Sequence, residues 1–295
     1  MTEETKPEHV EPVRIYVALG AYAPVTPHIY ANHIAFFCRE KKLAPPHIQI
    51  GIQCWERTPL LTFRNGAADE AIAADFDKLL FIDDDLRMPL DGPTVLGRLL
   101  SAQKYSPITA GLVFRRAWPY FPMMWTKSET DDHRKFFEQI LKWEGGIGLT
   151  VDAVHLACTM IDVNLLREMK AENPLIFEWD MSSDDIKFCR RASELGVRPV
   201  VDTSIQPLHM GLASQIGIDT FEAHLAEAKA DPERLQKEMG AVLIQREGSE
   251  AGFKQAEPEP VGDTPESGSP EAESCKSESA PADTPAHTDP EDRPS

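Results

Sequence analysis

The stretch Lys78-Leu-Leu-Phe-Ile-Asp-Asp-Asp85 decides the fold, because a short apolar run ends there in three adjacent carboxylates. The apolar residues 79–82 predict a strand buried on both faces, as in a mainly parallel sheet. In open α/β sheets ligands bind outside the carboxyl ends of the strands, which is where these acids fall. Adjacent negative charges repel one another, and a bound divalent cation would relieve that repulsion. The alternative is a solvated acidic turn before Pro89, but three acids directly after a buried strand favour the cation site.

Strand and helix signals alternate on both sides of this stretch, which is the pattern of a sheet built from βαβ units. The pairs Thr26-Pro27 and Thr58-Pro59 indicate two helix starts, each with the proline at the first helical position. Asp91 is expected to cap a third helix, and Ser182 with Asp185 resembles a capping box at a fourth. Expected strands are 14–19, 47–53, 79–82, 108–114, 150–161 and 200–202; expected helices are 26–42, 59–74, 91–102, 182–196 and 219–247, the last interrupted at 231–232.

The C-terminal segment differs from the rest of the chain in composition. Residues 249–295 hold 12 acids, 3 bases and 8 prolines, with Phe253 as the one aromatic residue. Such a segment cannot bury enough apolar surface to offset its chain entropy. We therefore expect a flexible N-terminus over 1–12, one folded α/β domain over 13–248, and a disordered acidic tail over 249–295 able to bind a protein partner.

Charge and cysteine usage restrict the class of protein. The net charge is −18, and half of it remains in residues 1–248, which hold 36 acids and 27 bases. An acidic body argues against a broad nucleic-acid-binding surface. The five cysteines have no C-x-x-C pairing, so we expect reduced core residues. The chain starts without a signal-peptide pattern and has no apolar run of membrane-spanning length, and we expect a soluble cytoplasmic protein.

Two basic stretches are candidates for ligand contact. Arg64-Asn65 lies in the second expected helix, where the guanidinium suits phosphate or carboxylate, although a plain exposed arginine is favoured on this stretch alone. Arg115-Arg116, followed by Trp118 and Tyr120, forms a basic and aromatic loop. Its cations are suited to a ligand phosphate or to an acceptor and its rings to a sugar face, and surface packing explains them equally well.

A second acidic pair, Asp184-Asp185, begins the helix that Gly196 ends. In a first helical turn, acids complement the helix dipole by roughly 0.3 to 1 kcal/mol each, which is the structural explanation. A strand at 200–202 and then His209 follow closely. This order is consistent with a second set of polar groups at the same edge of the sheet, although a lone histidine in this place is more often structural than a ligand.

These residues, in this order, resemble the GT-A-fold glycosyltransferases of the family 2 type. The resemblance covers roughly residues 14–211. A D-x-D pattern alone is weak because acids are common, whereas the ordered set with a late histidine is more specific. The matching residues are Arg64-Asn65, Asp83-Asp84-Asp85, Ser183-Asp184-Asp185, Gly196, Val201-Asp202-Thr203 and His209. The resemblance implies a GT-A (Rossmann-like) fold, an α/β architecture with a mainly parallel sheet flanked by helices.

The resemblance also implies roles for individual residues. The donor would be a nucleoside-diphosphate sugar, with its diphosphate on Mn²⁺ or Mg²⁺, and the acceptor hydroxyl is not identified. Metal-binding positions are Asp83, Asp85 and His209. Donor-binding positions are Gly20, Arg64, Asn65, Asp83 and Asp84. Asp185 falls on the position of the general base of inverting members, with Asp184 as the other catalytic acid.

Two other functions compete with sugar transfer. A nucleotidyltransferase would use a similar sheet and metal, but it would need a glycine-rich, basic loop after the first strand, and Gly20-Ala-Tyr-Ala-Pro24 is neither. A non-catalytic nucleotide-sugar-binding or interaction protein is the third possibility. Donor hydrolysis in the presence of metal would separate this third possibility from an enzyme.

Overall fold

The computed structural model describes residues 11–21, 25–117, 119–129, 135–179, 183–211 and 215–230. All of them belong to one compact unit, Met1–Leu243. The expected tail, residues 1–10 of the expected N-terminal segment, and the last expected helix beyond residue 230 lie outside the described residues. Trp118 and Ser182 lie outside them as well.

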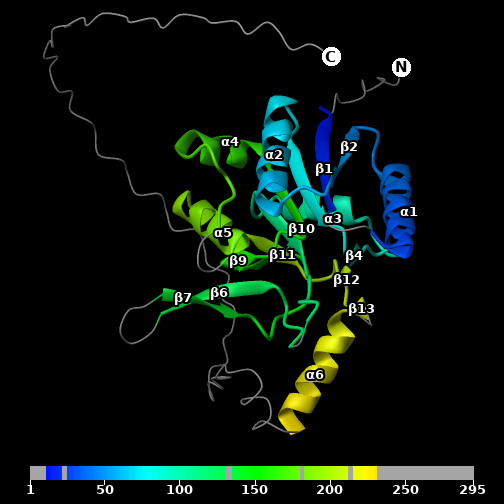
Figure 1. The fold of residues 1–295 in the computed structure, drawn as a ribbon, viewed down its shortest axis with the longest axis vertical. Coiled ribbons are helices and arrows are strands. Elements are labelled where there is room, and N and C mark those ends of the chain that lie inside the picture. Colours follow the sequence, from blue (N-terminus) through cyan, green and yellow to red (C-terminus); the bar gives the residue numbers. More distant parts are fainter. Residues whose placement is uncertain are drawn as a thin grey trace, which may run out of the picture. The chain divides into compact units, whose positions relative to one another are not determined.

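A seven-stranded sheet organises the described part of the chain (Figure 1), in the order β2-β1-β3-β10-β5-β11-β8. Five strands, β2, β1, β3, β5 and β11, run in one direction, while β10 and β8 run in the other. The mainly parallel α/β sheet expected from the sequence is therefore confirmed. The strand bounds are β1 Val13–Ala21, β2 Ile48–Glu56, β3 Lys78–Asp83, β5 Ile108–Gly111, β8 Leu149–Thr150, β10 Cys158–Asp162 and β11 Val200–Asp202.

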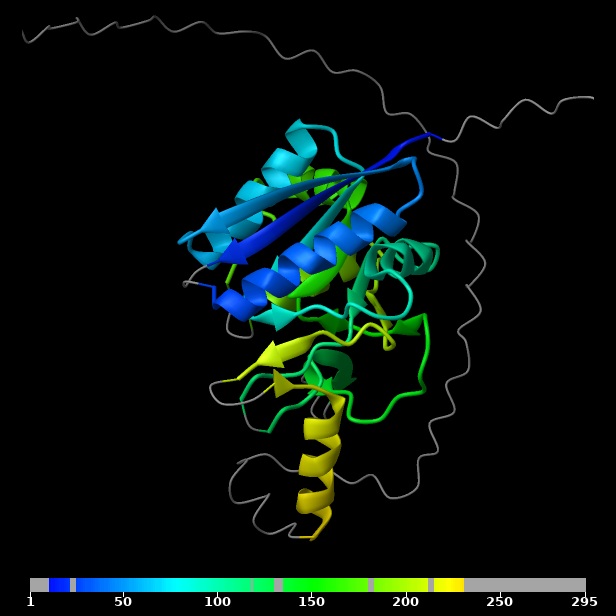
Figure 2. The same ribbon diagram turned by 90° about the vertical axis from the view of Figure 1, so that its right-hand side faces the viewer.

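Helices cover both faces of this sheet. Figure 1 shows α2, α4 and α5 on one side and α1 and α3 on the other, and the buried side chains form two matching clusters. Figure 2 shows α1 running alongside β1, near the edge of the sheet that β2 forms. The helix bounds are α1 Pro27–Leu43, α2 Leu60–Ala73, α3 Val95–Ala102, α4 Val163–Glu172, α5 Asp184–Glu194 and α6 Ile218–Ala230.

Two three-stranded sheets complete the described strands. One joins β13 (Gln215–Ile216), β12 (Leu208–Met210) and β4 (Leu86–Arg87), and the other joins β7 (Lys135–Gln139), β6 (Met124–Glu129) and β9 (Ala153–Val154). In the first sheet His209 pairs with Leu86, and the Met210 N–H donates to the Asp85 carbonyl at 2.9 Å. This pairing brings a late histidine next to the acidic stretch.

The strand expected over 150–161 is wrong as a single strand. The structure divides it into β8, β9 and β10, and β9 belongs to a different sheet from the other two. Because β10 is antiparallel to β3, the residues before β10 lie at the carboxyl end of β3. The Asp83 N–H accordingly donates to the Ala157 carbonyl at 3.0 Å.

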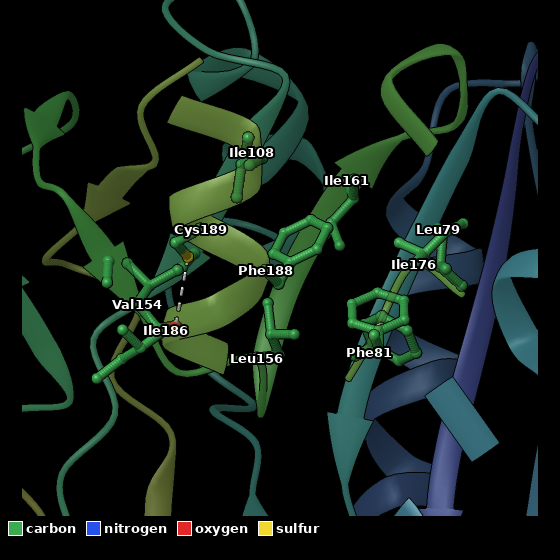
Figure 3. Packing of buried hydrophobic residues seen from close by; sticks show 14 of the residues in the cluster. Leu79, Phe81, Ile108, Val154, Leu156, Ile161, Ile176, Ile186, Phe188 and Cys189 are labelled. Carbon is green, nitrogen blue, oxygen red and sulfur yellow. Dashed lines mark hydrogen bonds between the residues drawn. The ribbon is translucent and has the colours of Figure 1, made fainter. Parts of the chain in front are cut away.

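The core between the sheet and α5 is apolar and closely packed (Figure 3). Phe188 of α5 lies toward Ile161 of β10, and the Cys189 thiol approaches the Val154 carbonyl at 3.9 Å. Burial raises the pKa of Cys189 to about 12, so this thiol is an inert core group. The expectation of core cysteines is confirmed for Cys158 and Cys189 and is wrong for Cys38 and Cys54, which are exposed.

Several helix starts differ from the sequence expectation by a residue or more. Thr26 occupies the N-cap position of α1 as expected, but α2 begins at Leu60 with Pro59 at the N-cap. At α5 the cap is Ser183, whose hydroxyl accepts from the Ile186 N–H at 3.2 Å. Ser183 caps the helix in place of the expected Ser182, because α5 begins at Asp184, directly after Ser183.

The expected cap of α3, Asp91, is also wrong. The N-cap position is Thr94, which makes no capping bond with its side chain. Instead, the fully buried Glu40 of α1 accepts from the Val95 N–H at 3.2 Å and from the Leu96 N–H at 3.0 Å. Burial raises the pKa of Glu40, and these hydrogen bonds act in the opposite direction. A residue 55 positions away in the sequence thus satisfies the first amides of α3.

We expect Glu40→Ala to lower the free energy of unfolding by about 1 to 3 kcal/mol, because two buried amides lose their acceptor. Glu40→Gln should cost less, since the amide oxygen still accepts. Urea denaturation measures both, with Glu168→Ala, an exposed acid of α4, as the control. Equal stability of the Glu40→Ala and Glu168→Ala proteins would contradict the long-range cap.

Candidate functional site

A cavity of about 690 Å³ opens at the carboxyl ends of β1 and β3. It lies there because Gly20 of β1 pairs with Asp83 of β3, so the chain leaves both strands at the same level. The lining residues include acidic, basic and aromatic side chains. They include Asp83, Asp84, Asp85, Arg115, Arg116, His155, Trp179 and His209, together with Gly20, Thr58, Pro59, Leu60, Phe63, Ala117 and Met123.

The structure brings some of the predicted site residues together on the cavity wall and places others behind it. Gly20, Asp83, Asp84, Asp85 and His209 line the cavity. Arg64, Asn65, Asp184 and Asp185 are not among the lining residues. At Gly20 a Cβ atom would meet the Phe63 ring at 2.6 Å, so the absence of a side chain allows the ring to pack there.

His209 and Asp85 lie next to each other in the cavity wall, where His209 Nε2 is 3.1 Å from Asp85 Oδ2. His209 Nδ1 lies 2.7 Å from the Phe114 carbonyl, which assigns the proton to Nδ1. In the neutral ring Nε2 is then an acceptor aimed at a carboxylate oxygen, so a proton or a cation must lie between them. Burial alone would lower the pKa of His209, but the hydrogen bond and charge of Asp85 outweigh it and raise the pKa.

Arg116 shares the same carboxylate. Its guanidinium donates to Asp85 Oδ2 at 2.9 Å from a largely exposed position. Burial acts to raise the pKa of Asp85, but His209 and then Arg116 hold it below its usual value. Asp85 is therefore an ionised group that lies beside the Arg116 guanidinium and the His209 imidazole.

Asp83 lies deeper. Burial is the largest effect on this carboxyl and raises its pKa, although His155 and Arg64 act to lower it. The charges of Asp85 and Asp185 add to the increase. A cation bound in the cavity would favour the ionised form of Asp83.

Arg64 joins α2 to the first turn of α5. Its guanidinium donates to the side chains of both Asp184 and Asp185, and the arginine is 1% exposed. These two charges raise the pKa of Arg64 despite its burial. The exposed arginine favoured on this stretch alone is therefore wrong, because the guanidinium binds two buried carboxylates. The geometry assigns Arg64 to the positioning of these carboxylates, and its expected contact with a donor stays a prediction.

The two acids bound by Arg64 have pKa values that are shifted in opposite directions. Asp185 accepts from Arg64 and from the Leu156 N–H at 3.3 Å, and these interactions with the charge of His155 lower its pKa against the effect of burial. Burial, with repulsion from Asp185, raises the pKa of Asp184. Asp185 is thus the more acidic member of the pair.

His155 connects Asp185 to the cavity and was not identified in the sequence. Its Nε2 lies 3.5 Å from Asp185 Oδ2, and the Ala157 N–H donates to its Nδ1 at 3.1 Å. The ring lines the cavity, whereas Asp185 is 6% exposed. The sequence does not indicate that His155 lies beside Asp185, because this position depends on β10 running antiparallel to β3.

Asn65 is likewise committed to a neighbouring loop. Its amide oxygen accepts from the Ile176 and Phe177 N–H groups at 2.9 and 3.0 Å, and its amide nitrogen donates to the Phe177 carbonyl at 2.8 Å. We therefore assign Asn65 to positioning that loop. Tyr120, for which sugar stacking and surface packing were equally favoured, lies edge-to-face with His224 at 6.1 Å and is not among the cavity residues.

The described residues contain no group of three or more His, Cys, Asp or Glu side chains able to hold a metal ion. Asp85 and His209 nevertheless supply an oxygen and a nitrogen, and the hydrogen bond from His209 Nδ1 to a carbonyl is the usual arrangement of a metal-binding histidine. A Mg²⁺ or Mn²⁺ ion at nucleotide sites often takes one or two protein ligands and completes its shell with phosphate and water. The two residues fit that type of site.

No protein-family model matches the sequence, and no curated protein is significantly similar to it. Protein A197 from STIV is a solved structure with a TM-score of 0.48 and 16% identity, covering 70% of this chain and 92% of that one. A 4-diphosphocytidyl-2C-methyl-D-erythritol synthase from Anaerococcus prevotii DSM 20548 has 0.39 and 14%, covering 76% and 99%. A glycosyltransferase involved in glycosylation of the major capsid of PBCV-1 has 0.35 and 12%, covering 65% and 82%. At these values, function has to be inferred from the cavity itself.

We expect Arg64→Ala to destabilise the protein by about 3 to 5 kcal/mol, because it leaves two buried carboxylates without their cation. Arg167→Ala is the matched control, since Arg167 pairs with Asp75 at the surface and exposed pairs contribute about 0 to 1 kcal/mol. Urea denaturation of the three proteins measures the difference. Similar losses for both variants would refute the structural role given to Arg64.

Proposed function

We propose that this chain is a glycosyltransferase that moves a sugar from a nucleoside diphosphate to an acceptor hydroxyl, with the donor bound in the cavity at the ends of β1 and β3. The observation that carries the proposal is the Asp85–His209 pair, two acceptor atoms 3.1 Å apart beside two arginines. Such a pair suits a divalent cation with a diphosphate next to it. Helices of the described part are too short or too polar to cross a membrane.

Asp85 and His209 would hold the cation, Mn²⁺ or Mg²⁺, and Asp83 would face its charge from a deeper position. When bound, the cation would supply neutralisation of the charge that develops on the leaving diphosphate. Arg115 and Arg116 line the same cavity and would bind phosphate oxygens. Binding of a diphosphate would thus engage Arg116, which in this structure pairs with Asp85.

Asp185 is the residue we assign as general base. In an inverting transfer the bond from the anomeric carbon to the diphosphate breaks, the acceptor oxygen bonds to that carbon, and the hydroxyl proton passes to the base. Asp185 is ionised because Arg64 and His155 lower its pKa, and it adjoins the cavity at His155. Arg64 and Asp184 would orient the carboxylate from behind.

We expect Asp85→Asn and His209→Ala each to weaken the binding of Mn²⁺ with a nucleoside diphosphate by about 10- to 100-fold. Arg116→Ala is the control for binding of Mn²⁺ without a nucleotide. It removes a cation that competes for Asp85, so the affinity for Mn²⁺ should be unchanged or higher. Titration calorimetry measures each binding. Unchanged affinity in both the Asp85→Asn and His209→Ala proteins would remove this cation site.

The activity itself is tested by incubating the protein with a panel of nucleotide sugars, Mn²⁺ and candidate acceptors, followed by mass analysis. We expect release of nucleoside diphosphate and a glycosylated product. Asp185→Asn should lower transfer by about 10²- to 10⁴-fold with donor affinity retained, since an amide cannot take the proton. Normal transfer by Asp185→Asn would exclude it as the base, and release of pyrophosphate from a nucleoside triphosphate would show nucleotidyl transfer instead.

A further inference from the structure

Trp179 is the exposed aromatic side chain of the cavity wall. The described cavity residues include two aromatic rings of the Phe, Tyr or Trp type, of which Phe63 is buried and Trp179 is 58% exposed. Apolar surface left in water forgoes the stabilisation that burial would contribute. Folding leaves this large ring available to a ligand in the cavity.

The loop that carries Trp179 is held firmly up to the residue before it. Phe177 stacks on Phe188 with ring centroids 4.9 Å apart and meets Phe81 edge-on at 5.6 Å. Asn65 binds both backbone groups of Phe177, as described above. The backbone before Trp179 is therefore anchored in the core between β3 and α5.

Glu178 fixes the next position. Its carboxylate lies 3.3 Å from Lys187 Nζ and 3.8 Å from an Arg191 guanidinium nitrogen, and it accepts from the Asn173 amide at 3.1 Å. An exposed aromatic ring on such an anchored segment loses little further freedom when a ligand binds. Trp179 thus combines an exposed ring with a backbone that is anchored on its N-terminal side.

The other cavity residues suit a ligand that has both an anionic part and a ring. Arg115 and Arg116 provide positive charge, and the acids provide a place for a cation, but an inorganic anion would leave Trp179 without a role. Flat ring faces stack on aromatic side chains, and for nucleic-acid bases this contributes about 1 to 3 kcal/mol per base.

We propose that Trp179 is a stacking platform for a ring of the bound nucleotide sugar, either its nucleobase or its pyranose. This deepens the proposed function and depends on it for the identity of the ligand. The anionic part of the ligand would bind at the arginines and at Asp85–His209, while Trp179 would select for the presence of a ring.

The test compares the wild-type protein with Trp179→Ala, Trp179→Phe and Tyr105→Ala by calorimetry in Mn²⁺. Tyr105 is also 58% exposed and is not a cavity residue, so it controls for loss of an exposed aromatic ring. The probes are inorganic pyrophosphate, the four diphosphates UDP, GDP, CDP and ADP, and the sugar nucleotides UDP-glucose and GDP-mannose.

We expect Trp179→Ala to bind the preferred ring-bearing probe roughly 5- to 140-fold more weakly, which is the stacking energy converted at 1.4 kcal/mol per tenfold. Trp179→Phe should retain most of the affinity, and pyrophosphate should bind all four proteins alike. A loss already seen with the diphosphate assigns the nucleobase to Trp179, and a loss seen only with the sugar nucleotide assigns the pyranose.

Unchanged affinity of Trp179→Ala for every ring-bearing probe, with pyrophosphate still bound, would overturn the platform alone. An equal loss of pyrophosphate affinity would also overturn it, because Trp179 would then support the cavity structurally. If wild-type protein binds neither pyrophosphate nor any nucleotide, the proposed function fails and the platform fails with it.

Discussion

The buried contact of Arg64 with Asp184 and Asp185 is the interaction on which the arrangement of the cavity depends. A guanidinium that is 1% exposed is stable in the interior because two carboxylates surround it, and those carboxylates need it for the same reason. The contact fixes the start of α5 against α2, across the carboxyl end of β3. His155 and the loop that carries Trp179 are positioned by groups that this contact holds in place.

The cavity lies where the direction of one strand changes. His155 precedes β10, and it lies beside the acids at the end of β3 because the two strands are antiparallel. The pairing of β12 with β4 brings His209 to Asp85 in a similar way. One edge of the sheet thereby gathers carboxylates, imidazoles and guanidinium groups from four segments of the cavity wall, residues 83–85, 115–116, 155 and 209. Their mutual electrostatic effects shift the pKa values of Asp83, Asp85 and His209.

Some residues of the site position other protein groups, and others face the cavity where a ligand would bind. Asn65 and Arg64 bind neighbouring protein groups, and the side chains left facing the cavity are the acids, the arginines, the imidazoles and Trp179. A rigid second layer of this kind holds contacting groups at fixed distances before a ligand arrives. The proposed sugar transfer and the proposed stacking platform both depend on this division.

Local patterns in the sequence were sufficient for the alternating strands and helices, the mainly parallel sheet, and the placement of Asp83, Asp84 and Asp85 at a strand end, because apolar periodicity and strand-end acids are properties of neighbouring residues. The resemblance to a glycosyltransferase family added His209 to that set. Tertiary structure alone decided that residues 150–161 are three strands, that Glu40 caps α3, that Arg64 is buried between two acids, and that His155 and Trp179 line the cavity. Each of these depends on which distant segments meet and in which direction they run, and that is set by the packing of the whole chain, which no local pattern records.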